Sequence, residues 1–125
     1  MFTADQLVAH AVGDYLLQTD WMANNKMHSH VAAGVHARTY ALPFLLLRPS
    51  LVALAVIIGT HFLIDRYRLA RYVSWAKNQI GPLADRSLTA TGFPAASPPW
   101  LAAWLLTIED NILHVLINGF ALGVV

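Results

Sequence analysis

The stretch "LVALAVIIGTHFLIDRYR", residues Leu51 to Arg68, joins an apolar run to a histidine and an aspartate four residues apart. The two ionisable residues are His61 and Asp65. A step of four residues turns an α-helix by about 400°, so both side chains lie on one face, one turn apart. The stretch therefore predicts an apolar helix that carries two adjacent ionisable groups.

The same spacing occurs in two other apolar segments. His10 and Asp14 stand in "AHAVGDYLLQ". Asp110 and His114 stand in the reverse order in "EDNILHVLIN". Di-metal helix bundles build their sites from carboxylates and histidines at helical spacing on facing helices. We therefore expect the three pairs to converge on a shared polar centre, with His36 of a fourth apolar segment as a further candidate.

The composition is too apolar for an average soluble domain. Hydrophobic residues make up 57% of the 125 residues and charged residues 12%, against about 45–50% and about 25% in typical soluble domains. Ionisable groups inside membrane spans normally face the bundle interior and mark function. We therefore expect a single integral membrane domain of the all-α class over residues 1–125. The formal net charge of +1 gives no indication of a nucleic-acid partner.

The distribution of apolar and basic residues predicts a topology. We expect a four-helix transmembrane bundle with an interfacial segment between the third and fourth helices, and that segment, together with Arg66 at the end of the third helix, holds five of the eight Lys and Arg residues. Basic connections are typically cytoplasmic, which places both termini on the other side of a bacterial inner membrane. The predicted helices are residues 2–19, 31–47, 51–67 and 99–125.

This topology brings a polar group from every helix to a similar depth, between the cytoplasmic interface and the middle of the membrane. Three aspartates at that depth would cost roughly 8–10 kcal/mol, and a structural zinc ion returns on the order of 10–16 kcal/mol. Mixed imidazole and carboxylate ligands suit zinc, manganese or iron(II). The predicted ligands of a divalent metal are His10, Asp14, His36, His61, Asp65, Asp110 and His114.

Two functions are compatible with such a site. In the first, the protein is a metal-dependent hydrolase that polarises a lipid or phosphoester substrate and activates a bound water, with His36 and Asp14 as catalytic residues. In the second, the His–Asp pairs are metal-free hydrogen-bonded pairs that hold helices together. The protein would then be a non-enzymatic phage or bacterial membrane protein whose polar core serves assembly, ion or proton movement, or interaction with a host membrane complex. The lipid bilayer is the expected partner in both cases. The sequence does not decide whether the protein forms a homo-oligomer.

Three motifs, "AHAVGDYLLQTDWMA", "THFLID" and "EDNILH", resemble a family of small bacterial and phage membrane proteins known as domain of unknown function 3307. Asn111 stands where that family usually has glutamine. A looser resemblance, carried by "GTHFLID", is to bacterial inner-membrane metal-dependent hydrolases and zinc-dependent phospholipases C. It implies metal ligation by the His-x-x-x-Asp pair. The residues that match the family pattern are His10, Asp14, Tyr15, Leu17, Gln18, His36, His61, Asp65, Asp110 and His114.

Overall fold

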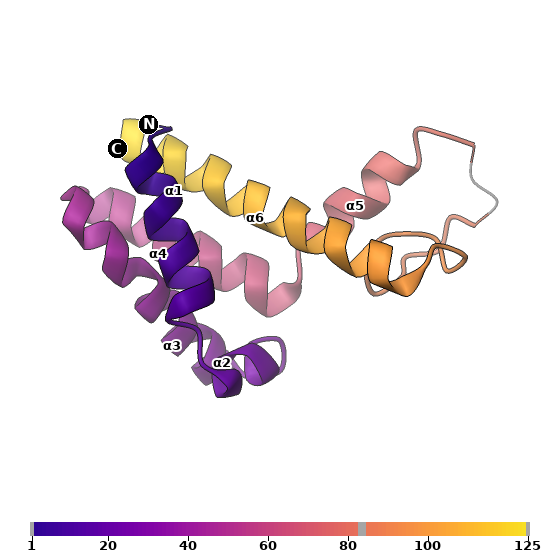
Figure 1. The fold of residues 1–125 in the computed structure, drawn as a ribbon, viewed down its shortest axis with the longest axis horizontal. Coiled ribbons are helices and arrows are strands. Elements are labelled where there is room, and N and C mark those ends of the chain that lie inside the picture. Colours follow the sequence, from indigo (N-terminus) through magenta and orange to yellow (C-terminus); the bar gives the residue numbers. More distant parts are fainter. Residues whose placement is uncertain (1, 83–84, 125) are drawn as a thin grey trace. The chain divides into compact units, whose positions relative to one another are not determined.

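A computed structural model describes residues 2–82 and 85–124, and these residues are helical or irregular with no strand among them. They form six α-helices, one π-helical turn and one 3₁₀ segment (Figure 1). The predicted all-α class is therefore confirmed. The chain divides into two compact units, the first ending at Tyr67 and resuming at His114, the second running from Arg68 to Leu113. A single domain over residues 1–125 stays a prediction.

The first predicted helix is shorter than expected and irregular. Helix α1 (Ala4–Ala11) runs directly into the π-helical turn η1 (Val12–Leu16). A new helix, α2 (Asp20–Asn25), then begins because the Thr19 hydroxyl caps its first turn and accepts a hydrogen bond from the Met22 amide at 3.3 Å. The predicted continuous helix over residues 2–19 is therefore wrong beyond Leu16.

The second and third helices follow the predicted ranges closely. Helix α3 (His30–Ala41) tightens into the 3₁₀ segment η2 (Leu42–Leu47), where Pro43 lacks the amide hydrogen that an α-helix would use. Arg48 then takes a left-handed conformation with φ 51° and ends the segment. Helix α4 covers Leu51–Tyr67, as predicted, and packs against α3.

Small and aromatic side chains form the core of the first unit. Tyr40 and Phe44 are fully buried, with ring centroids 5.3 Å apart, and they pack with Ile57 and three alanines. Ala33 and Ala37 lie buried on the face of α3 that also carries His36. Because alanine side chains are short, α3 can approach its neighbours closely there, and this approach brings His36 close to the neighbouring elements.

The second unit contains helix α5 (Ala70–Asn78) and the first part of α6 (Pro99–Val124). Ser74 and Lys77 of α5 both contact the Glu109 carboxylate of α6. Gly92 has φ 79° and lies so close to the Arg71 carbonyl that a Cβ atom would clash with it. The predicted fourth helix is confirmed over Pro99–Val124, and residue 125 lies outside the described residues.

Among the described residues, one helix, α6, is long and apolar enough to cross a bilayer. The helical run α1–η1 has only 13 residues, 8 and 5 in its two parts, and at about 1.5 Å per residue it reaches roughly 20 Å, short of the roughly 30 Å of a hydrocarbon core. The helical class is thus confirmed, whereas four separate membrane-spanning helices are not.

Candidate metal centre

Four buried side chains in the first unit point ligand atoms at one another. They are Asp14 from η1, His36 from α3, and His61 and Asp65 from α4. The Nε2 atoms of the two histidines are 3.0 Å apart. Asp65 Oδ2 lies 3.1 Å from His36 Nε2 and 3.2 Å from His61 Nε2. Asp14 Oδ1 lies 3.3 Å from His36 Nε2 and 3.9 Å from His61 Nε2.

These separations are close to those of a tetrahedral metal site. Zinc–nitrogen and zinc–oxygen bonds of about 2.0–2.1 Å place the ligand atoms of a regular tetrahedron about 3.3–3.4 Å apart. Four of the five measured separations lie between 3.0 and 3.3 Å, and the fifth, from Asp14 to His61, is 3.9 Å. A small movement of the Asp14 carboxylate would therefore complete a site for one ion.

Hydrogen bonds alone do not easily pair all of these ligand atoms. Two imidazole nitrogens in contact can share at most one proton, because each nitrogen is either a donor or an acceptor. Both Nε2 atoms, of His36 and His61, also face the same oxygen of Asp65. One cation between the three atoms would satisfy all of them at once.

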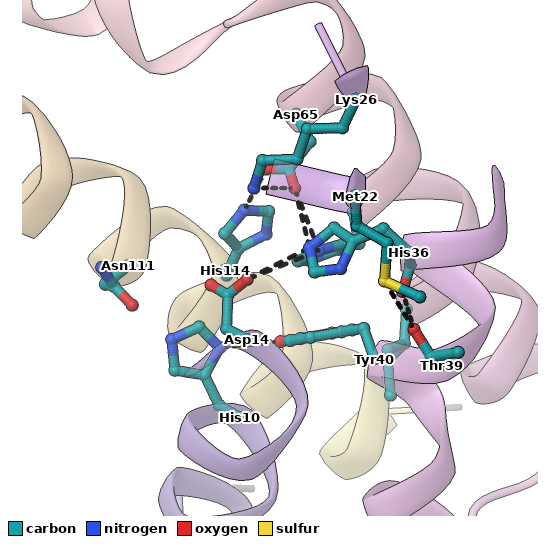
Figure 2. A network of polar contacts seen from close by, with 12 residues as sticks. His10, Asp14, Met22, Lys26, His36, Thr39, Tyr40, Asp65, Asn111 and His114 are labelled. Atoms are coloured by element: carbon teal, nitrogen blue, oxygen red, sulfur yellow. Dashed lines mark hydrogen bonds and ion pairs between the residues drawn. The ribbon is translucent and has the colours of Figure 1, made fainter. Parts of the chain in front are cut away.

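Asp65 connects this group to two further residues (Figure 2). Its Oδ2 atom accepts a hydrogen bond from Lys26 Nζ at 2.7 Å. Its Oδ1 atom lies 3.3 Å from Nε2 of His114 on α6. The contact with His114 is of the kind that orients a ligating carboxylate in metal sites.

Tyr40 fixes the orientation of His61. Its ring stacks on the His61 imidazole with centroids 3.6 Å apart and an angle of 13° between the planes. The Tyr40 hydroxyl accepts a hydrogen bond from the Asn118 side-chain amide at 2.5 Å and lies 2.8 Å from Nδ1 of His10. The Nδ1 atoms of His36 and His61 are buried and form no hydrogen bond with the described residues, so the polar contacts of these two rings are made through Nε2.

The family of this chain follows from its sequence. A family model described as "Protein of unknown function (DUF3307)" matches residues 2–86. The chain belongs to the DUF3307 family. The match confirms the resemblance carried by the N-terminal motif and "THFLID", and it ends before "EDNILH". No curated protein and no solved structure matches the chain, and the resemblance to membrane hydrolases has no support from the comparisons.

The DUF3307 match includes the whole four-residue cluster and Lys26. Of the seven predicted ligands, the structure brings together Asp14, His36, His61 and Asp65, with His114 against the fourth of them. His10 lies instead beside the Tyr40 hydroxyl. Asp110 is in the part of α6 that belongs to the second unit. For both, a role as metal ligand stays a prediction.

Two residues of this network are absent from the sequence-based prediction. Tyr40 stands four residues after His36 on α3, so the spacing that picked out the His–Asp pairs could have found it too. Lys26 carries no such signal, because it lies in the connection between α2 and α3 and reaches a residue 39 positions away.

Proposed function

We propose that this DUF3307 protein binds one divalent metal ion inside a membrane-embedded helical unit, through Asp14, His36, His61 and Asp65. The proposal depends on one observation: four ligand atoms from three separate elements lie within 4.8 Å of one another, and four of their separations are between 3.0 and 3.3 Å. Two imidazole nitrogens and two carboxylate oxygens favour zinc, with manganese and iron(II) as the other suitable ions.

The exposed surface supports a membrane location. Large contiguous apolar surfaces are rare on soluble monomers and mark contact with partners or lipid. Leu45, Leu46 and Leu51 are exposed on η2 and α4. Along α6, exposed apolar side chains recur at every fourth position over the whole helix. They are Trp100, Trp104, Ile108, Ile112, Leu116, Phe120 and Val124.

The lengths of the helical runs specify which of them could cross the bilayer. The 18 residues His30–Leu47 reach about 30 Å, at about 1.5 Å per α-helical and 2.0 Å per 3₁₀ residue. Helix α4 has 17 residues, the lower limit for a span. We propose that these two runs and α6 enter the membrane, and that the shorter α1–η1 run inserts without crossing it. A bacterial inner membrane, with both termini away from the cytoplasm, remains the predicted setting.

The ligand number favours binding over catalysis. Structural zinc sites have four protein ligands, whereas catalytic sites keep one position for water. If all four cluster residues bind the ion, that position is filled. Hydrolysis of a lipid phosphoester would require one of them to leave, and Asp14, with the longest separation, is the ligand best placed to do so. A role for Asp14 and His36 in hydrolysis is therefore a secondary prediction.

Metal analysis of the detergent-purified protein tests the proposal. We expect about one zinc ion per chain after loading and removal of free metal, and less than about a tenth of that in His61→Ala and Asp65→Asn, because each loses a ligand. His28→Ala is the matched control, since His28 is exposed and outside the cluster. Size-exclusion elution and helical content identify variants that have lost the fold. Substoichiometric zinc in the wild-type protein, or equal zinc in a folded His61→Ala variant, would overturn the proposal.

A further inference from the structure

Lys26 binds the carboxylate oxygen that also faces both imidazoles. Lys26 Nζ lies 2.7 Å from Asp65 Oδ2, and the same oxygen is 3.1 Å from His36 Nε2 and 3.2 Å from His61 Nε2. The lysine side chain is 19% exposed, against 3% for Asp65. Lys26 thus brings a positive charge into a buried group of ligands from a position that keeps access to the surface.

We propose that Lys26 and a divalent metal ion are alternative partners of Asp65. In the metal-free protein the Lys26 ammonium holds the carboxylate, and binding of the ion releases the ammonium. This inference depends on the proposed metal site and adds to it a competing cation within the protein.

The geometry makes simultaneous binding unfavourable. An ion bound to Asp65 Oδ2 and to the two histidine nitrogens would lie about 2.0–2.2 Å from that oxygen. The ammonium is already 2.7 Å from the same oxygen. Two cations on one oxygen repel each other, and the repulsion is strong because little water screens a buried site.

The formal charges lead to the same conclusion. Asp14 and Asp65 together carry −2, which a divalent ion neutralises completely. If Lys26 stayed, the buried group would carry an uncompensated +1, and uncompensated buried charges are costly. Without the ion, Lys26 reduces the charge of the two carboxylates to −1, so it stabilises the metal-free protein.

The backbone around Lys26 allows this exchange by side-chain rotation alone. The Lys26 amide donates to the Met22 carbonyl at 2.9 Å and closes helix α2. The Arg66 guanidinium of α4 donates to the Met27 carbonyl at 2.7 Å. The main chain is therefore held on both sides of Lys26, while its flexible four-carbon stem can turn the ammonium toward the surface.

Amine labelling with mass spectrometry tests the release directly. The chain has two lysines, Lys26 and Lys77. Lys77 also contacts a carboxylate, that of Glu109, but it lies in the second unit and outside the cluster, so it serves as an internal control. Adding zinc to the metal-depleted, detergent-purified protein should raise the rate of Lys26 acetylation several-fold and leave the Lys77 rate unchanged. An unchanged or lower Lys26 rate in a protein that binds zinc would overturn the inference.

A substitution tests the competition by a second route. Lys26→Met keeps much of the apolar stem and removes the charge, so it should raise zinc affinity about tenfold, because the ion no longer displaces a cation. Lys77→Met should leave the affinity unchanged. A folded Lys26→Met protein with equal or weaker zinc affinity would show that Lys26 supports the site rather than competes for it. A wild-type protein that binds no zinc would refute the proposed function itself, and this inference with it.

Discussion

At the scale of single residues, one carboxylate organises the site. Asp65 Oδ2 faces Lys26, His36 and His61, and its Oδ1 faces His114, so four nitrogen atoms from four parts of the chain meet one side chain. A buried carboxylate is stable only when it is well paired. These contacts therefore stabilise the buried Asp65 carboxylate, and the carboxylate in turn helps to hold the histidine side chains in position.

Tyr40 should act on the site through the orientation of His61. Tyr40→Phe keeps the ring that stacks on His61 but removes the hydroxyl bound to Asn118 and near His10. We expect this variant to bind zinc within a few-fold of the wild type and to lose about 1–3 kcal/mol of stability, because buried polar groups lose a partner. Tyr40→Leu removes the stack as well and should weaken zinc binding by about 10–100-fold.

Zinc titration and thermal unfolding measure these two effects separately, and the absorption spectrum of the Co²⁺-loaded protein reports any change in ligand geometry. If Tyr40→Phe and Tyr40→Leu weaken zinc binding equally, the hydroxyl and not the stacked ring orients His61, and the role assigned to the ring is wrong.

Helical spacing predicted the cluster only where the chain is a regular α-helix. His61 and Asp65 meet as expected, because α4 is continuous through both. Spacing is a weaker guide for His10 and Asp14, because η1 is a π-helix, whose i→i+5 hydrogen bonds change the rotation per residue. Asp14 contacts His36, and His10 contacts the Tyr40 hydroxyl. The contact of Lys26 depends on how the connection after α2 folds back, which spacing does not encode.

Among the helical elements, the close contact between η1 and α3 places Asp14. Gly13 makes this contact possible, since a Cβ atom there would lie 2.5 Å from the Tyr40 carbonyl oxygen and 2.8 Å from its ring. Both neighbouring atoms belong to a fully buried residue on α3. A side chain at position 13 would therefore push η1 away from α3, and Asp14 would move with it.

Gly13→Ala should thus lower both stability and metal binding. We expect a loss of about 1–3 kcal/mol from overpacking, together with weaker zinc binding. Gly34→Ala is the matched control, because Gly34 lies within α3 and a Cβ atom added there would meet no atom within 4 Å. It should instead stabilise the helix by about 0.5–1 kcal/mol. Thermal unfolding and zinc titration of both variants check this, and a Gly13→Ala protein as stable as Gly34→Ala would contradict it.

For the protein as a whole, the sequence predicted the helices better than their relation to a membrane. The bounds of α4 and the start of α6 follow from long apolar runs that are flanked by polar or turn-forming residues. The break after Leu16 and the change to 3₁₀ geometry after Ala41 depend on local hydrogen bonding, which an apolar pattern does not reveal. The hydropathy pattern therefore predicted a single helix over α1, η1 and the residues up to Thr19.

The exposed apolar positions of α6 provide a test of its environment. Ile112 lies at the middle of the helix and is exposed, whereas Val124 is exposed at its end. If α6 crosses a bilayer, Ile112→Arg places a charge near the midplane and costs about 2.5–3.5 kcal/mol on insertion. Val124→Arg should cost much less, because a long side chain at a helix end can reach the interface. We expect the fraction of protein that stays in membranes after a carbonate wash to fall for Ile112→Arg and to remain at the wild-type level for Val124→Arg. Equal membrane retention of both variants, or a wild-type protein that the wash releases, would show that α6 meets water or another protein rather than lipid.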